Sequence, residues 1–279
     1  MRILITGANG QLGQELQHLL RSRGIDDFDA ADRTKLDITD ESKVEEYFAD
    51  NKPKIVYHCA AYTAVDAAEG EGKLLNEKVN ALGSEIIAKA CEKYNSTLVY
   101  ISTDYVFDGS KESGEYMPSD PTGPRNEYGR AKLLGEKAVK KYCSKYFIVR
   151  TAWVYGEYGH NFVYTMLNLA KTHKQLTVVS DQIGRPTWTK TLADFITYLV
   201  DNKVAYGTYQ CSNDGICSWY DFAKEILKDK DVEVLPVSSE EYPTVAYRPH
   251  YSVMHLAKET GFEFPMWKDA LHEFLLSID

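Results

Sequence analysis

Three glycines stand between the first apolar run of the chain and the helical pattern that follows it. The run RILIT at 2–6 has the composition of a buried strand, and TGANGQLGQEL then supplies Gly7, Gly10 and Gly13. In such a turn the first glycine permits the tight reversal and the second lets the backbone approach a pyrophosphate. The third lets the helix pack closely on the sheet, and the helix N-terminus offers free N–H groups to phosphates. The spacing therefore predicts a dinucleotide-binding turn.

Short apolar runs alternate with helical patterns through the first half of the chain. Strand–helix alternation implies right-handed crossovers and a parallel sheet buried on both faces. We therefore expect an α/β fold, a Rossmann-type doubly wound parallel sheet with a smaller C-terminal substrate-binding lobe. The expected strands are 2–6, 27–31, 54–63, 96–103 and 146–156, with helices after the glycine turn, at 37–51, at 75–94 and from about 126.

The pattern becomes less regular after residue 156. Helices are expected at 161–173, 190–202 and 218–228, and strands at 176–181 and 206–212. We predict an NAD(P)-binding Rossmann domain over 1–156 and a region, 157–279, that is largely the substrate-binding lobe. Elements near 161–173 and 190–212 are expected to return to the first domain.

The composition excludes several classes of partner. The net charge of −9 argues against a protein that binds nucleic-acid backbones, which needs a basic face. No apolar stretch approaches the roughly 20 residues of a membrane helix, and no signal peptide precedes the first strand. The five cysteines are odd in number and lack the spacing of a zinc or redox motif. We expect a cytoplasmic protein with reduced thiols.

Two neighbouring residues bear on the choice of cofactor. Asp32 ends the second expected strand, 19 residues after Gly13. A carboxylate there typically accepts a hydrogen bond from the adenosine ribose, whereas the adjacent Arg33 suits the 2′-phosphate of NADPH. The sequence leaves NADPH and NADH open.

A tyrosine and a lysine four residues apart lie in NEYGRAK. Four-residue spacing puts Tyr128 and Lys132 on one face of a helix. Thr103 ends the strand 96–103, and the carboxyl ends of parallel strands are where ligands bind. A lysine cation favours the phenolate and is expected to lower the pKa of the tyrosine from about 10. We expect Tyr128 to exchange a proton, Lys132 to hold the nicotinamide ribose, and Thr103 to donate to a carbonyl oxygen.

These segments resemble a known family. The set TGANGQLG, AAYTAVDAAE, STDYVFDG, NEYGRAK and RTAWVYG resembles the extended short-chain dehydrogenase/reductases. Within them it is similar to the dTDP-4-dehydrorhamnose reductases, from residue 1 to at least Arg248-Pro249. The resemblance implies NADPH- or NADH-dependent reduction of dTDP-4-dehydro-β-L-rhamnose at C4, the last step in making dTDP-L-rhamnose, a precursor for cell-surface polysaccharide.

The resemblance also implies site residues. Cofactor-binding positions are Gly7, Gly10, Gln11, Leu12, Gly13, Asp32, Arg33, Asp37, Ile38, Ala60, Ala61, Tyr62, Thr63, Tyr128 and Lys132; substrate-binding positions are Thr103, Asp104, Trp153 and Arg248. Among these, Arg248 corresponds to an arginine near the nucleotide diphosphate, which suits bidentate pairing with phosphate.

The chain departs from the family at one position. Some members form dimers bridged by Mg²⁺, and Glu15 matches one ligand of that ion. A second ligand falls at Lys190, which cannot bind Mg²⁺ because the ion needs oxygen donors. We therefore expect no metal, and a monomer or weak homodimer that takes a small nucleotide sugar.

Two other functions remain open. One is a non-catalytic NADP-binding subunit resembling the regulatory subunit of methionine adenosyltransferase, although Thr103, Tyr128 and Lys132 are all retained. The other is a nucleotide-sugar epimerase, which uses the same Tyr–Lys pair. A dehydratase is disfavoured because Thr103-Asp104 is followed by Tyr105, where dehydratases carry a glutamate.

Overall fold

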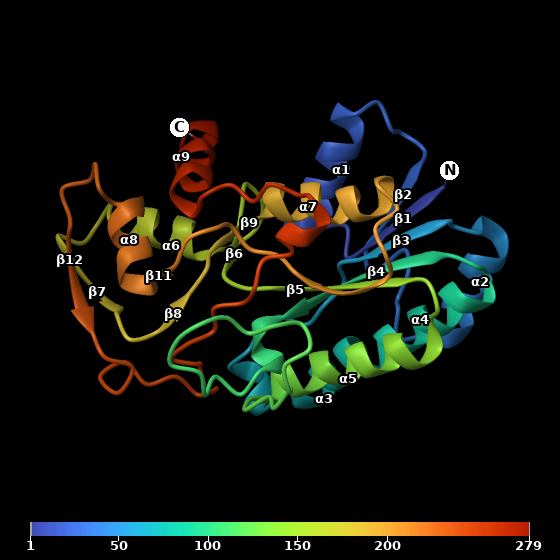
Figure 1. Cartoon of the computed structure of the whole chain (residues 1–279), viewed down its shortest axis with the longest axis horizontal. Coiled ribbons are helices and arrows are strands. Elements are labelled where there is room, and N and C mark those ends of the chain that lie inside the picture. The colour runs from blue at the N-terminus through green and yellow to red at the C-terminus, as the bar shows by residue number, and fades with distance from the viewer. Residues whose placement is uncertain (1, 279) are drawn as a thin grey trace.

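Six parallel strands form the central sheet of the computed structural model, which describes residues 2–278 (Figure 1). Their order across the sheet is β10-β5-β4-β3-β1-β2. The bounds are β1 (Ile3–Thr6), β2 (Phe28–Ala31), β3 (Ile55–His58), β4 (Thr97–Thr103), β5 (Tyr146–Thr151) and β10 (Gly207–Gln210). Apolar side chains such as Leu4 and Ile5 project to opposite faces and are both fully buried. A sheet of this kind needs cover on both sides.

Helices supply that cover. One face carries α1 (Gln11–Ser22) and α7 (Thr189–Asp201), which pack on each other through the cluster that holds Leu16 and Leu199. The other face carries α2 (Glu41–Asn51), α4 (Ser84–Lys93) and α5 (Glu127–Tyr142), whose cluster holds Phe48 and Val139. Figure 1 shows these two groups above and below the sheet. The arrangement confirms the predicted Rossmann-type fold.

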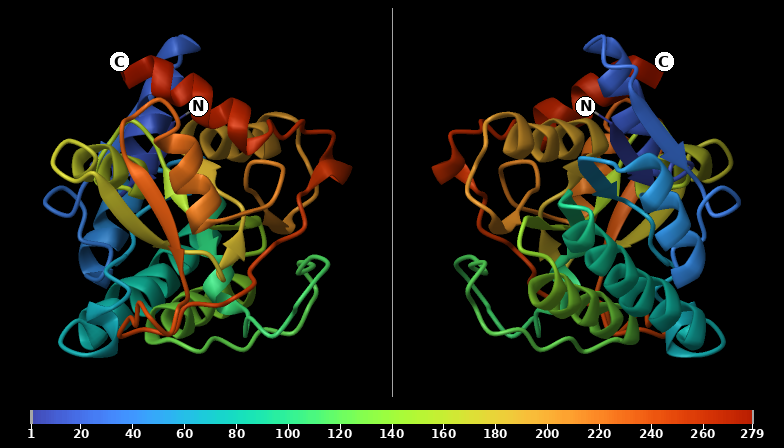
Figure 2. Two further views of the ribbon diagram at one scale, coloured as in Figure 1. Left: turned by 90° about the vertical axis from the view of Figure 1, so that its left-hand side faces the viewer. Right: turned by 90° about the vertical axis from the view of Figure 1, so that its right-hand side faces the viewer.

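The remaining elements pack around a third apolar cluster. They are β6 (Val154–Tyr155), α6 (Phe162–Leu169), β7 (Gln175–Val179), β8 (Ile183–Gly184), β9 (Thr187–Trp188), β11 (Cys217–Ser218), α8 (Trp219–Ile226), β12 (Glu233–Val237) and α9 (Trp267–Ile278). The strands pair as β6-β9, β7-β12 and β8-β11. Figure 2 shows α9 on the same side of the molecule as α1.

The chain passes between the two regions more than once. β10 joins the central sheet beside β5, and α7 packs on α1, whereas α6 packs on α8. Both β10 and α7 lie in sequence between elements of the third cluster. The division of the chain at residue 156 stays a prediction.

Several element boundaries differ from the sequence expectation. The helix expected at 37–51 begins at Glu41, because Asp40 caps it by accepting from the Lys43 N–H. The strand expected at 146–156 is interrupted, since Trp153 has a left-handed φ of 49°. The helix expected at 75–94 has three parts, α3 (Lys73–Glu77), a π-helical η2 (Lys78–Gly83) and α4. Short 3₁₀ segments complete the elements: η1 (Ala67–Glu69), η3 (Asp104–Val106) and η4 (Lys258–Thr260).

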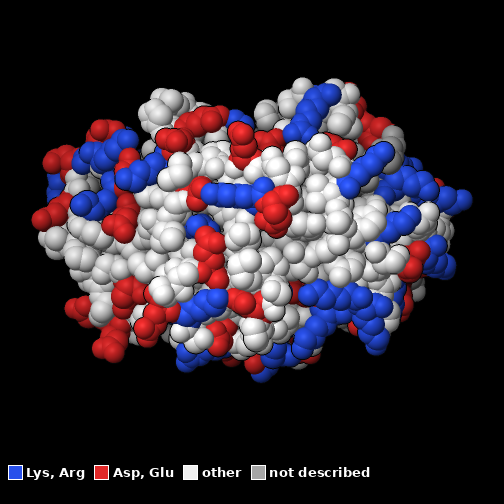
Figure 3. All heavy atoms as spheres, viewed as in Figure 1, with Lys and Arg blue, Asp and Glu red and all other residues white. Residues whose placement is uncertain are grey.

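The surface carries both signs of charge. On the face in Figure 3, basic and acidic side chains are interspersed, with uncharged areas between them. Among residues 2–278, no helix has the length and apolar character required to cross a bilayer.

Candidate active site

Two adjoining cavities lie at the carboxyl ends of the central strands. The larger has a volume of about 600 Å³ and the smaller about 320 Å³. Both are lined by Gly10, Cys59, Ala60 and Ala61, so the glycine turn and the end of β3 separate them. Together they make an elongated site, which is the shape that a dinucleotide requires.

The glycine turn has the close packing expected of a dinucleotide cradle. Gly7 has a φ of +66°, and a Cβ there would lie 2.5 Å from the backbone nitrogen of Ala60. A Cβ on Gly13 would lie 2.4 Å from the carbonyl oxygen of Gly7. Gly10 is the N-cap of α1 and lines both cavities, so the helix N-terminus faces the site. These residues fit a pyrophosphate bound by backbone N–H groups.

The smaller cavity gathers the residues expected around the adenosine. Asp32, Arg33, Asp37, Ile38 and Tyr62 all line it. The Asp32 carboxylate already accepts hydrogen bonds from the Thr34 hydroxyl and N–H and from Asn9. These bonds, that of the Thr34 hydroxyl foremost, lower the pKa of Asp32. Arg33 is exposed, and its nearest acidic partner is Asp37 at 3.7 Å.

The larger cavity brings the expected catalytic side chains together. Thr103, Tyr128 and Lys132 line it, with Asp104 and Trp153. Thr103 is there because β4 ends at it. Tyr128 lies in the first turn of α5, whose N-terminus is fixed by Asn126 Oδ1 accepting from the Gly129 N–H at 2.7 Å. The remaining cofactor positions on this cavity are Gln11, Leu12, Gly13 and Thr63.

Lys132 is a buried cation. Lys132 is only 2 % exposed to solvent, and its ammonium lies 4.2 Å from the centre of the Tyr100 ring. Burial lowers the pKa of Lys132 to about 7, while the Glu136 carboxylate acts in the opposite direction. The charge of Lys132 is therefore sensitive to its surroundings near neutral pH.

The prediction that Lys132 lowers the pKa of Tyr128 is wrong in this structure. The pKa of Tyr128 is raised, first by burial and then by the Asp104 carboxylate, while a hydrogen bond with Thr103 opposes the rise. The cost of moving a phenolate out of water dominates this shift, and Lys132 is not among the groups that act on the Tyr128 pKa. Tyr128 is a neutral phenol at neutral pH, the form that donates a proton.

Asp104 has a carboxylate with unused capacity. The residue is 4 % exposed, and its Oδ1 accepts from the Thr103 hydroxyl at 3.0 Å. Its Oδ2 is buried without a hydrogen-bond partner among residues 2–278. Burial raises the pKa of Asp104 to about 6, and the nearby hydroxyls of Ser252 and Thr103 limit the rise. A buried oxygen normally accepts a hydrogen bond, and a sugar hydroxyl is a donor that could supply one to Oδ2.

Trp153 forms one wall of the larger cavity. Its ring stacks on that of Trp219, with 3.9 Å between the ring centroids and 15° between the planes. Gly184 lies against it, since a Cβ at that position would come within 2.8 Å of the Trp153 ring. The left-handed backbone at Trp153 thus places an apolar surface beside Thr103 and Tyr128.

Arg248 lies apart from these residues and lines neither of the two cavities just described. Its guanidinium donates to the Asp66 carboxylate at 2.8 Å and lies 5.9 Å from the ring centre of Tyr105. Tyr105 does line the larger cavity, edge-on to Tyr128. Arg248 is therefore near the site through Tyr105 and is engaged with Asp66.

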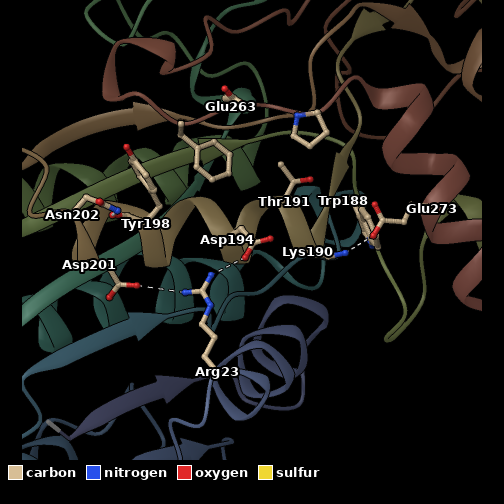
Figure 4. Close-up of a pocket in the computed structure, with 12 residues that line it drawn as sticks. Arg23, Trp188, Lys190, Thr191, Asp194, Tyr198, Asp201, Asn202, Glu263 and Glu273 are labelled. Carbon is tan, nitrogen blue, oxygen red and sulfur yellow. Dashed lines mark hydrogen bonds and ion pairs between the residues drawn. The ribbon is translucent and has the colours of Figure 1, made fainter.

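The position considered for Mg²⁺ carries a salt bridge. Lys190 pairs with Glu273, and in the same groove Arg23 lies between Asp194 at 2.9 Å and Asp201 at 3.4 Å (Figure 4). Glu15 is buried, and its pKa is raised to about 7, first by burial and then by Glu157 and Asp194. Within residues 2–278, no three His, Cys, Asp or Glu side chains are grouped to hold a metal ion.

Some residues of the site carried no signal in the sequence. Cys59, Gly159, His160 and Trp219 line the larger cavity, and Leu75, Lys78 and Val79 line the smaller. Lys78 and Val79 belong to the π-helical segment, and no sequence motif indicates which of its side chains face the cavity. Ser102, by contrast, was expected at this edge because it adjoins Thr103 at the end of the strand 96–103, and it lines the larger cavity.

The fold and the site together define an NAD(P)-dependent enzyme of the extended short-chain dehydrogenase/reductase class. The family described as RmlD substrate binding domain matches residues 1–279. The chain belongs to this family, that of the dTDP-4-dehydrorhamnose reductases.

Relatives of known name agree with this placement. A dTDP-4-dehydrorhamnose reductase of Aggregatibacter actinomycetemcomitans is 40 % identical over 97 % of each chain. A crystal structure of the Clostridium acetobutylicum dTDP-4-dehydrorhamnose reductase has a TM-score of 0.96 and 46 % identity, covering 100 % of this chain and 99 % of that one. The Bacillus anthracis enzyme, solved in complex with NADP, has a TM-score of 0.94 and 43 % identity, covering 99 % of both.

Proposed function

We propose that this chain reduces the C4 ketone of dTDP-4-dehydro-β-L-rhamnose with NADPH or NADH, giving dTDP-L-rhamnose in the last step of dTDP-rhamnose biosynthesis. The observation that carries the proposal is the convergence of Thr103, Tyr128 and Lys132 on one cavity that begins at the glycine turn. The family relationship adds the substrate.

The residues of the cavity divide the work of reducing a ketone. The reduced nicotinamide, when bound, supplies the hydride that the carbonyl carbon receives. Tyr128 donates the proton that the carbonyl oxygen needs, since its phenol is neutral. Thr103 donates a hydrogen bond to the same oxygen while negative charge develops there. Lys132 holds the ribose hydroxyls, and its ammonium stabilises the tyrosinate left by proton transfer.

Other residues are assigned to the nucleotide sugar. Asp104 accepts from a sugar hydroxyl through its unpartnered Oδ2. Trp153, which lines the cavity and is backed by Trp219, packs on the sugar ring. Arg248 remains assigned to the diphosphate. This role requires that the guanidinium N–H groups not bonded to Asp66 reach the phosphates.

The decisive experiment mixes purified protein with enzymatically prepared dTDP-4-dehydro-L-rhamnose and NADPH. Loss of reduced-nicotinamide absorbance and formation of dTDP-L-rhamnose are followed together. Wild type is expected to turn over, and Tyr128→Phe to lose about 10²–10⁴-fold in rate. Tyr242→Phe, at a tyrosine that is 59 % exposed, is the matched control and should keep full activity.

Other outcomes identify the alternatives. Conversion of a nucleotide sugar without net NADPH consumption would indicate an epimerase. A protein that binds NADPH yet leaves every nucleotide sugar unchanged would indicate a binding subunit. The cytoplasmic location and the monomeric or weakly dimeric state stay predictions.

A further inference from the structure

A buried ion pair lies one helical turn beyond Lys132. Glu136 and Arg150 are each only 1 % exposed, and two hydrogen bonds of 2.8 and 2.7 Å join the guanidinium to the carboxylate. The Ser102 hydroxyl donates a third hydrogen bond, of 2.6 Å, to Glu136. All three side chains are buried. A buried ion pair loses its hydration, so it is tolerated only when short, well-oriented hydrogen bonds such as these offset that loss.

The ion pair connects the elements that carry the catalytic residues. Glu136 is on α5, while Ser102 and Arg150 are paired residues on β4 and β5. Ser102 immediately precedes Thr103 in β4. Figure 1 shows α5 packed along these two strands. Glu136 therefore ties the helix of Tyr128 to the strand of Thr103.

The same carboxylate shares a helix face with Lys132. The two residues are four apart on α5, so their side chains are neighbours. On β4, the Lys132 ammonium lies over the ring of Tyr100, 4.2 Å from its centre. On α5 itself, Tyr128 is a neutral phenol, because burial raises its pKa.

Two neutral groups, His58 and Cys59, lie at the carboxyl end of β3 near Lys132. Burial lowers the pKa of His58 to about 3, so this imidazole is uncharged. Burial raises the pKa of Cys59 to about 12, so this residue is a thiol. Among the described groups that act on Lys132, the Glu136 carboxylate, ion-paired with Arg150, is thus the one that favours the charged ammonium from outside the neutral set.

We propose that Glu136, held in place by Arg150 and Ser102, is a positioning residue for the reaction, whose carboxylate keeps the buried Lys132 ammonium charged. The inference rests on the proposed roles of Tyr128 and Lys132. It assigns Glu136 a task beyond balancing Arg150: a neutral Lys132 would hold the ribose less firmly and would not stabilise the tyrosinate.

The test is the pH dependence of kcat/KM, measured with NADPH and the nucleotide sugar. The alkaline limb reports loss of the Lys132 proton. Glu136→Gln removes the carboxylate charge, so the limb is expected to move to lower pH by about one unit. Glu136→Asp keeps the charge and should restore most of the shift. Ser102→Ala loosens the network but keeps the charge, so its limb should stay at the wild-type pH.

Two further measurements guard against misfolding and against failure of the proposed function. Glu136→Gln leaves Arg150 unpaired, so the double variant E136Q/R150Q, which buries no charge, is measured beside it. Its shift should have the same direction but be smaller, because the Arg150 cation, which opposes a charged Lys132, is removed as well. Titration of the Lys132 ε-carbon by NMR in ¹³C-lysine protein, assigned through Lys132→Met, needs no turnover.

The outcomes separate cleanly. A Lys132 titration that moves to lower pH in E136Q/R150Q supports the inference even if the wild type fails to reduce the sugar. An unchanged titration and an unchanged limb, with activity reduced equally at all pH values, would overturn it and leave Glu136 a structural partner of Arg150.

Discussion

Trp153 and Trp219 stack face to face with 3.9 Å between their ring centroids, and this contact joins the end of the central sheet to the C-terminal lobe. Trp153 follows β5, whereas Trp219 begins α8. Both rings line the larger cavity beside Tyr128. The surface that faces the substrate therefore depends on how the lobe packs on the sheet.

Replacing Trp219 is expected to weaken substrate binding selectively. An aromatic pair contributes roughly 0.5–1.5 kcal/mol beyond the area it buries, so Trp219→Ala should raise the KM for the nucleotide sugar by up to about tenfold. Steady-state kinetics with each substrate varied would measure this, and Trp219→Phe, which keeps a ring, should lose less. An equal loss of NADPH affinity would argue against a substrate-facing stack.

Thr103 should act mainly on the rate. Removing one donor to a developing oxyanion costs about 10²–10³-fold in kcat, so Thr103→Val is expected to lose that much with little change in the NADPH dissociation constant. Thr103→Ser retains the hydroxyl and should retain most activity. A valine variant with normal kcat and a raised KM would make Thr103 a binding residue instead.

Arg33 is expected to select the phosphorylated cofactor. Its guanidinium is exposed at the rim of the smaller cavity, and hydrogen bonds to charged groups contribute about 1.5–3 kcal/mol. Arg33→Met should therefore weaken 2′,5′-ADP at least tenfold and leave 5′-ADP unchanged, as measured by calorimetry. An equal loss of affinity for 2′,5′-ADP and 5′-ADP would indicate instead that Arg33 helps to fold the turn. Ribose binding by Asp32 would then be tested next.

Glu15 should make stability depend on pH. Its pKa is raised from 4.5 to about 7, so the folded chain holds this proton more tightly than the unfolded chain. The resulting stabilisation is present below about pH 4.5 and is lost as the pH rises to about 7. Glu15→Gln cannot ionise, so its melting temperature should exceed that of wild type at pH 8 by about 2–4 °C. At pH 4.5 the two should agree within error.

The same measurement tests for a metal. With Lys190 engaged by Glu273, added MgCl₂ is expected to leave the wild-type melting temperature and sedimentation coefficient unchanged at pH 8. A rise that Glu15→Gln abolishes would show that the ion binds despite the lysine.

Local patterns were sufficient where neighbours in sequence become neighbours in space. The turn from Gly7 to Gly13 depends on a strand and the helix directly after it, and Tyr128 and Lys132 share a face because helical spacing requires it. The parallel sheet also followed from the alternation of strands and helices. These features need no knowledge of distant contacts.

Features that depend on tertiary packing were not predicted. Trp219 reaches the cavity only because α8 packs against the sheet end, and Arg248 is drawn to Asp66 by the fold of the C-terminal segment. The direction of the Tyr128 pKa shift depends on burial, which spacing does not reveal. The break in the strand at Trp153 reflects a backbone conformation rarely adopted by a bulky residue.

The path of the chain through β10 and α7 has a consequence for engineering. A fragment ending at residue 156 would lack β10, the edge neighbour of β5, and would expose Leu12, Leu16 and Leu20, which are buried in the cluster that α7 completes. We therefore expect the fragment 1–156 not to fold on its own. An engineer who exchanges the lobe between relatives would have to exchange several separate segments, because β10 and α7 lie in sequence between its elements.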